Sequence, residues 1–187
     1  MLGHADQTTA SSMSSCLSHR GPDGSGGFYE QFEGGGVAFG HARLSIVDIA
    51  GSPQPIGSDH GAVLIQNGEI YNQVKLRSQN FGYPWRTSGD SEAILAMHRS
   101  ATRTLGASPD NPAEAHVEWL SQLDGIWGFS LWDPSRRELI LSRDPMGVNP
   151  LVRTPLPDGP LPFASEVQAS NAHPALHPKP PSTSDHT

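Results

Sequence analysis

Residues 62 to 72 have the sequence AVLIQNGEIYN, in which a largely apolar run leads into an Asn-Gly pair. The nearly continuous apolar run of residues 62 to 66 predicts a buried strand. Asn67 and Gly68 are typical of a sharp turn, because glycine adopts a positive φ at little cost. The stretch therefore predicts a strand that ends directly in a turn.

Further elements are expected on the N-terminal side of this unit. Residues 5 to 17 lack Pro and Gly and carry apolar residues at helical spacing, which predicts a short helix. The three glycines at positions 34 to 36 predict a hairpin. Short runs before and after these glycines predict three strands, at residues 28 to 32, 36 to 40 and 42 to 48.

On the C-terminal side, residues 88 to 100 predict a helix. Asp90, near the start of this segment, is suited to N-capping, and the residues after it form an apolar side typical of a helix. Residues 115 to 123 predict a second amphipathic helix. The runs WGFSLWD and ELILSRD predict an antiparallel pair of strands, and PFASE a further short strand. This order of elements favours an α+β domain built on antiparallel sheets.

With 187 residues, the chain has the length of one domain with one core. We expect residues 1–170 to form this domain. The segment NAHPALHPKPPSTSDHT, residues 171–187, is rich in proline and polar residues, which predicts a disordered tail.

The composition disfavours several classes of function. With 12 Lys and Arg against 19 Asp and Glu, the net charge of -7 would repel a phosphate backbone, so we expect no nucleic-acid partner. No apolar run approaches the roughly 18 residues of a membrane span, and no signal peptide is visible, so the cytoplasm is the expected compartment. The single Cys16 excludes an internal disulfide and any multi-cysteine metal site, and we infer no protein-bound metal.

Seven segments together resemble the glutamine amidotransferase domain of asparagine synthetases, a class II (N-terminal-nucleophile) family. In chain order they are HRGPDGSG, GHARLSIVD, NGEIYN, SGDSEAIL, LDGIWGFSLWD, RDPMGVNPL and FASEV. The resemblance runs from about Ala5 to Ala169. It implies a four-layer αββα fold of the Ntn-hydrolase type, with two stacked antiparallel sheets between helices. It also implies that an N-terminal Cys, with its own α-amino group as the base, hydrolyses glutamine to glutamate and ammonia.

The resemblance implies a glutamine site with charges of both signs. Arg43 matches the clamp for the α-carboxylate, for which a planar fork of donors fits better than lysine. Asp90 matches the residue that grips the α-ammonium. Without the resemblance, Arg43 would be interpreted as a surface arginine on a strand and Asp90 as a plain helix N-cap.

Asn67 and Gly68 match the oxyanion hole of the family, formed by a side-chain amide and a backbone N–H. The alternative is a bare β-turn. The family uses the backbone of the next residue, Glu69, in the same pocket. Three apolar residues are implied to line the pocket or to contribute carbonyls, although they could equally belong to the core: Leu44, Ile46 and Val47.

Other charged residues are expected to have structural roles. His19, Arg20 and Asp23 lie in a loop that braces the site in the family. Arg143 and Asp144 are predicted to form a structural ion pair. Cys16 lies late in the predicted helix and is interpreted as a small core residue.

The sequence departs from the family at its start. The family begins Met-Cys-Gly-Ile and runs through a buried first strand, whereas Met1 is followed by Leu2 here. We therefore expect that residues 1 to 4 correspond to the loop after that strand and that the first strand is missing with its nucleophile. Cys16 cannot replace it, because no α-amino group lies beside it. We also expect no ATP-binding synthetase domain in this chain, so ATP and magnesium would belong to that domain, and no cofactor is expected here.

Three interpretations are open. The favoured one is a truncated copy, or a mis-started gene model, of a glutamine-hydrolysing asparagine synthetase that is inactive alone. The second is a non-catalytic glutamine-binding module that regulates a partner carrying the synthetase half. The third is a structural remnant, like the amidotransferase-like domain of β-lactam synthetases.

Overall fold

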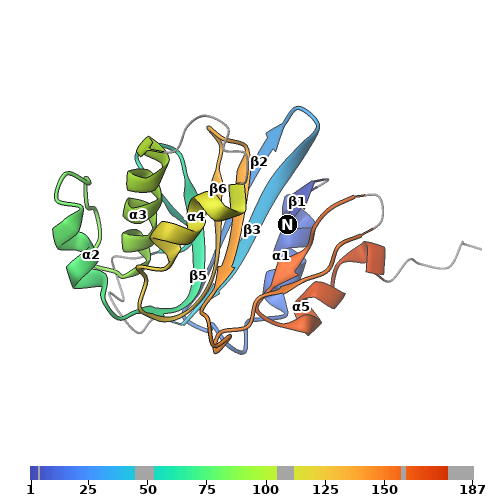
Figure 1. Cartoon of the computed structure of the whole chain (residues 1–187). Helices are drawn as coiled ribbons and strands as arrows, with labels where there is room; N and C mark the ends of the chain where they lie inside the picture. The colour runs from blue at the N-terminus through green and yellow to red at the C-terminus, as the bar shows by residue number, and fades with distance from the viewer. Residues whose placement is uncertain (4, 45–52, 105–111, 157–158, 177–187) are drawn as a thin grey trace, which may run out of the picture.

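The computed structural model describes residues 1–3, 5–44, 53–104, 112–156 and 159–176. Two antiparallel sheets form the centre of the molecule (Figure 1). The first sheet has the strand order β1-β3-β2, with β1 at Leu2–Gly3, β2 at Gly24–Phe32 and β3 at Gly35–Arg43. The second has the order β4-β5-β6-β7, with strands at Ile56–Gly57, Val63–Ile70, Gly125–Asp133 and Glu138–Arg143.

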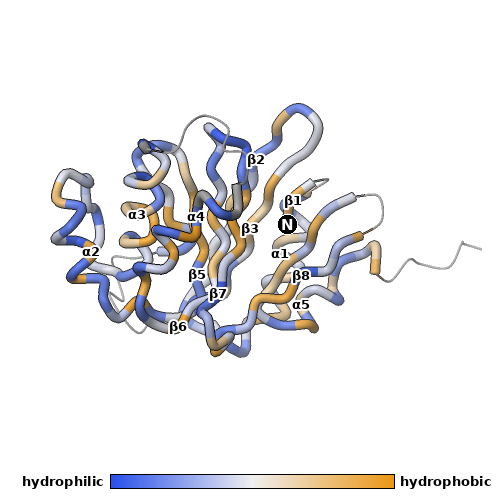
Figure 2. The backbone as a smooth tube through the Cα atoms, in the orientation of Figure 1, coloured by the Kyte–Doolittle hydropathy of each residue, from blue (hydrophilic) through white to orange (hydrophobic). Residues whose placement is uncertain are grey.

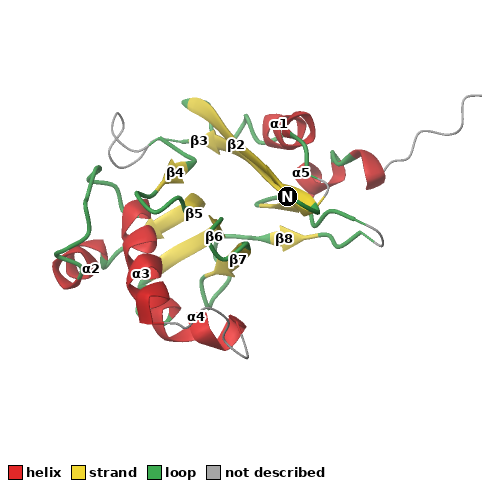
Figure 3. Ribbon diagram, turned by 90° about the horizontal axis from the view of Figure 1, so that it is seen from above, coloured by secondary structure: helices red, strands yellow, loops and turns green. Residues whose placement is uncertain are grey.

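Helices cover the outer face of each sheet, which is clearest from above (Figure 3). The first sheet is covered by α1 (Gln7–Ser15), against which α5 (Val167–Asn171) packs. The second is covered by α3 (Ser91–Thr104) and α4 (Pro112–Leu120), with α2 (Gln73–Gln79) beside α3. A small pair, β8 (Val152–Arg153) and β9 (Phe163–Ala164), and a 3-10 turn at Pro174–Leu176 complete the chain.

Three apolar clusters lie between the four layers, and Figure 2 shows apolar residues concentrated there. The largest packs α3 and α4 against the second sheet, around Leu95 and Phe129. The middle cluster joins the two sheets through residues such as Phe39 and Trp132. A small third cluster, which includes Met13, packs α1 against the first sheet. This arrangement confirms the predicted αββα sandwich.

The helix predicted over residues 5 to 17 is α1. Its N-cap is Asp6, whose carboxylate accepts the Thr9 N–H at 2.7 Å. On β3, a Cβ at Gly40 would lie 2.6 Å from the Ala10 carbonyl, so only glycine allows α1 to lie so close to the sheet. Cys16 follows α1 and is exposed, so the prediction of a core cysteine is wrong.

The turn predicted at Asn67-Gly68 is also wrong, because β5 continues through both residues to Ile70. Asn67 pairs with Gly128 and Gly68 with Trp127 of β6, and these cross-strand pairs outweigh the local turn preference. The positive φ expected of the glycine is present, at 129°.

Residues 1 to 4 were expected to form a loop, but Leu2 and Gly3 form β1 and pair with β3. Met1 extends this pairing, since its amine donates to the Ala38 carbonyl at 2.6 Å. Beyond Ala38, β3 has a partner on its β2 side only, within the described residues. The expectation of a loop without a strand at residues 1 to 4 is therefore wrong.

Two further boundaries differ from the expectation. The strand expected over residues 42 to 48 ends at Arg43, and residues 45–52 lie outside the described residues. The predicted tail starts at residue 171, whereas the 3-10 turn follows α5 and His173 is buried. The folded part therefore reaches at least Leu176.

The predicted ion pair of Arg143 with Asp144 is absent from the described contacts. The Asp144 carboxylate instead accepts the main-chain N–H groups of Trp127, Val148 and Asn149. Arg20 and His19 do have a structural role, since both contact Glu166. No helix in the described part of the chain is long and apolar enough to cross a membrane.

Candidate functional site

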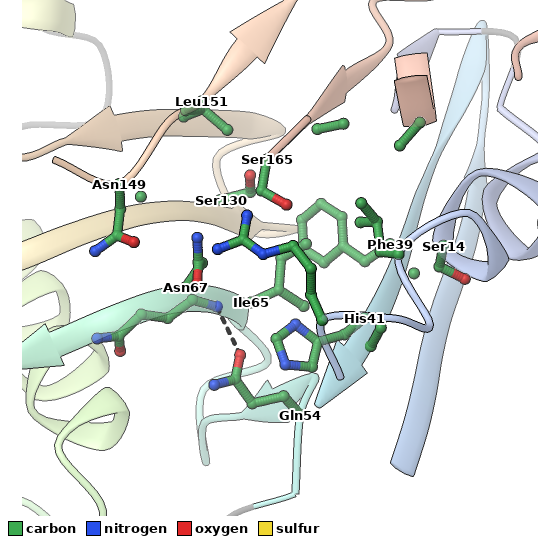
Figure 4. A pocket seen from close by; sticks show the side chains of 18 of the residues that line it. Ser14, Phe39, His41, Gln54, Ile65, Asn67, Ser130, Asn149, Leu151 and Ser165 are labelled. Atoms are coloured by element: carbon green, nitrogen blue, oxygen red, sulfur yellow. Dashed lines mark hydrogen bonds between the residues drawn. The ribbon is translucent and has the colours of Figure 1, made fainter. Parts of the chain in front are cut away.

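A cavity of about 660 Å³ lies between the two sheets, at the ends of β3 and β5. Side chains alternate along a strand, so His41 and Arg43 share the face of Phe39, which packs toward the second sheet. Ile65 and Asn67 on β5 face back toward the first sheet in the same way. Figure 4 shows side chains from both sheets around this cavity.

The edge of β5 that borders the cavity presents three main-chain N–H groups. The Gln66 N–H donates to Oε1 of Gln54 at 2.6 Å, drawn as a dashed line in Figure 4. The Ile70 N–H donates to the Asp90 carboxylate at 2.7 Å. Between them, the Gly68 N–H points to the same edge and has no acceptor among the described residues. This N–H is therefore available to a ligand.

Only glycine fits at position 68. A Cβ there would lie 2.1 Å from the Ile126 carbonyl, and its φ of 129° is strained for other residues. Nδ2 of the neighbouring Asn67 is buried and has no hydrogen-bond partner among the described residues. A side-chain amide and a main-chain N–H from adjacent residues thus line the cavity as unpaired donors, which is the chemistry of an oxyanion site.

Asp90 is held from two sides at the beginning of α3. Its Oδ2 accepts the Ile70 N–H and, at 3.1 Å, the side-chain amide of Gln66. The loop before Asp90 is fixed by Glu92, whose fully buried carboxylate accepts the N–H groups of Arg86 and Thr87. These contacts fix the Asp90 carboxylate at the cavity wall.

Charges of opposite sign lie on the cavity wall. Arg43, at the end of β3, carries the positive charge, and Asp90, directly before α3, carries the negative one. Burial, followed by the positive charge of Arg43, lowers the pKa of His41 to about 4, so this ring is neutral at pH 7. A zwitterion with an amide side chain would find a cation, an anion and amide donors in one cavity.

The structure brings most of the predicted site residues together. Arg43, Asn67 and Asp90 line the cavity, as do Gly68 and Glu69. Leu44 lies on the lining but is 56% exposed, which places it at the mouth. Ile46 and Val47 are outside the described residues.

Several residues of the cavity wall were not identified from the sequence. His41 could have been found, because it lies two residues before Arg43 and therefore on the same face of the strand. Gln54 and Asn149 come from loops, where no periodicity indicates the direction of a side chain. Asn149 is held by the hydrogen bond of its main-chain N–H to Asp144, at 3.1 Å. Within the described lining there is no cysteine.

A comparison with known protein families covers almost the whole chain. The family model described as "Glutamine amidotransferase domain" matches residues 2–184. The chain belongs to the glutamine amidotransferase domain family. In the described part of this amidotransferase domain, Nδ2 of Asn67 and the Gly68 N–H have no partner in the cavity between the sheets.

Curated relatives of the amidotransferase domain are asparagine synthetases. A putative glutamine-hydrolysing asparagine synthetase of Mycobacterium bovis is 41% identical over 79% of this chain and 22% of the relative. Asparagine synthetase 1 of Bacillus subtilis is 35% identical over 82% of this chain, and asparagine synthetase B of Escherichia coli is 34% identical over 84%. The chain spans about a quarter or less of the length of these relatives, 22% and 26% in the latter two.

A solved structure gives the same fold for the amidotransferase domain. The glutamine phosphoribosylpyrophosphate amidotransferase of B. subtilis, complexed with ADP and GMP, superposes with a TM-score of 0.69. The superposed part covers 91% of this chain and 42% of the solved chain, and the sequences are 22% identical. At this identity the likeness shows the fold alone.

Proposed function

We propose that the cavity binds L-glutamine and that the domain serves an asparagine-forming enzyme, in which ammonia from glutamine is passed to a synthetase part. The observation that carries the proposal is the set of complementary groups on one cavity wall. Arg43 would hold the α-carboxylate and Asp90 the α-ammonium. Asn67 and Gly68 would donate hydrogen bonds to the oxygen of the side-chain amide.

The residues described on the cavity wall account for binding and orientation of glutamine, without a thiol to attack it. In the proposal, hydrolysis requires a nucleophile next to β3, and ATP and magnesium act in the synthetase part. The proposed compartment is the cytoplasm. The names of the curated relatives, which are asparagine synthetases, support asparagine as the product of the complete system.

A second candidate is a non-catalytic glutamine-binding module that partners a separate synthetase. The lack of a cysteine on the described cavity wall favours it. In this case glutamine occupancy would regulate the partner instead of supplying it with ammonia. The two candidates share the binding site and differ in turnover.

The experiment compares the chain as written with one that carries Met-Cys-Gly-Ile directly before Met1. Because Leu2 pairs with Val37, a strand extended in this register places the added cysteine opposite His41. Directly opposite residues share a face of the sheet, so the thiol would point into the cavity. After removal of the added methionine, this cysteine also carries the free α-amino group.

Glutaminase activity and calorimetric glutamine binding are measured for both proteins, with an added Met-Ala-Gly-Ile strand as the matched control. Turnover in the cysteine protein only, with binding in all three, supports an amidotransferase. Binding in all three without turnover in any supports the non-catalytic module. The glutamine site is rejected if none of the three binds glutamine.

A further inference from the structure

Gln66 is a buried polar residue that the proposed chemistry does not use. It lies on β5 and is 4% exposed. Its side chain alternates with those of Ile65 and Asn67, so it lies on the same face as Leu64, toward α3. An apolar residue is expected at such a position, because this face belongs to the largest apolar cluster.

The amide of Gln66 is oriented by Asp90. Its Nε2 donates to Oδ2 of Asp90 at 3.1 Å. The reverse orientation would bring an amide oxygen against a carboxylate oxygen, so the carboxylate determines which end of the amide faces it. The main chain of Gln66 is fixed as well, through the bond of its N–H to Gln54.

The other end of the amide has no partner. Oε1 of Gln66 is buried and finds no donor among the described residues. A buried acceptor without a donor is unfavourable for folding, and leucine or methionine would avoid this cost. Stability therefore does not explain a glutamine at this position, whereas its contact with Asp90 does.

The two hydrogen bonds that Asp90 receives end on the same atom. Ile70 and Gln66 both donate to Oδ2, and no described residue donates to Oδ1. The carboxylate is thus fixed by one oxygen, and the other oxygen is left for a ligand. Two donors on Oδ2 restrict rotation of the carboxylate more than the Ile70 N–H alone.

We propose that Gln66 is a positioning residue for recognition of the α-ammonium group. By holding Oδ2 of Asp90, it directs Oδ1 toward the ammonium of the amino-acid ligand, and it makes the cavity selective for ligands that carry this group. The inference rests on the proposed glutamine site, which it deepens. Gln66 acts through Asp90 and does not itself touch the reacting amide.

The test measures the Kd of L-glutamine and of glutaramate, the same molecule without its α-amino group, for the full chain by calorimetry. Gln66→Met keeps the length of the side chain and removes its donor. We expect the Kd of glutamine to rise about tenfold and that of glutaramate to stay within about twofold. Gln66→Leu is the second variant, and Gln79→Met, at an exposed position on α2, is the matched control.

Unfolding in urea separates positioning from a structural role. We expect Gln66→Met to be at least as stable as the natural chain, although it binds glutamine more weakly. In an Asp90→Asn background, the same substitution should cause no further weakening of glutamine binding, because no carboxylate is left to position.

Equal losses for both ligands would overturn the inference and assign Gln66 to general packing. It would also be overturned if the natural chain prefers glutamine over glutaramate and Gln66→Met keeps this preference in full. A natural chain that binds neither ligand would instead refute the proposed function itself.

Discussion

Oδ2 of Asp90 accepts a hydrogen bond of 2.7 Å from the main-chain N–H of Ile70, which joins the beginning of α3 to the end of β5. Asp90→Ala removes this acceptor and leaves the buried Ile70 without its partner. We expect the free energy of unfolding to fall by about 1–3 kcal/mol, as measured in urea, and glutamine binding to be lost. Asp124→Ala, at an exposed residue, is the control. Unchanged stability would contradict the role of this bond.

Arg43→Ala should abolish measurable glutamine binding, because the α-carboxylate would lose its cation. We expect the Kd to rise by at least about 100-fold, and Arg43→Lys to recover only part of the loss, since lysine lacks the planar fork of donors. Titration calorimetry measures both variants. Arg153→Ala, at an exposed position on β8, serves as the control. An unchanged Kd in Arg43→Ala would refute the assignment of the carboxylate site.

Gly68→Ala should be strongly destabilising. The new Cβ would meet the Ile126 carbonyl at 2.1 Å, at a φ of 129° that alanine rarely adopts. We expect a loss of about 2–4 kcal/mol in the free energy of unfolding. Gly57→Ala on β4 is the matched substitution, because a Cβ there meets nothing within 4 Å. Similar urea midpoints for the two variants would show that the main chain at Gly68 adapts.

His98 should make the protein sensitive to acid. It is fully buried on α3, stacked between the rings of His60 and His116, and its Nε2 lies 3.5 Å from Oδ2 of Asp133. Burial is the main cause that lowers its pKa to about 4. Asp133 and Glu138 oppose this shift, whereas His60 and His116 add to it.

Between pH 6.5 and about 4, the unfolded chain binds a proton at His98 that the folded chain does not. The contribution of His98 is therefore complete above pH 6.5 and is lost as the pH falls toward 4. We expect about 2 kcal/mol less stability from this residue at pH 4.5 than at pH 7. Urea unfolding at both pH values measures it, and His98→Phe should reduce the difference. An equal difference in the variant would assign the acid sensitivity to other groups, such as His41.

The layers of the fold could be predicted because the amphipathic patterns are strong. In α3, the residues predicted to share one side are all buried: Ile94, Leu95, Met97 and His98. The hairpin of β6 and β7 was predicted for the same reason, as the turn residues Pro134 and Ser135 separate two apolar runs. Periodicity and turn chemistry are local, so one sequence is sufficient to identify them.

The predictions that were wrong or incomplete concern contacts between residues distant in the sequence. The strand β5 passes through Asn67-Gly68 because β6 pairs with it there, which no local rule indicates. Gln54 reaches the site through its bond to the Gln66 main chain, twelve positions later. Motif resemblance predicted a shared site for Arg43 and Asp90, and both line the cavity, but it said nothing of the hydrogen bonds that orient the Asp90 carboxylate.

The carboxylate of Glu92 should slow the hydrogen exchange of two amides in the loop before α3. Oε2 of this fully buried residue accepts both the N–H and the hydroxyl of Thr87, and its Oε1 accepts the Arg86 N–H at 3.0 Å. Amides in loops normally exchange quickly with deuterated solvent, whereas these two can exchange only when the start of the helix opens. In a hydrogen–deuterium exchange experiment, the amides of Arg86 and Thr87 should therefore show the protection of the helix instead of that of a surface loop.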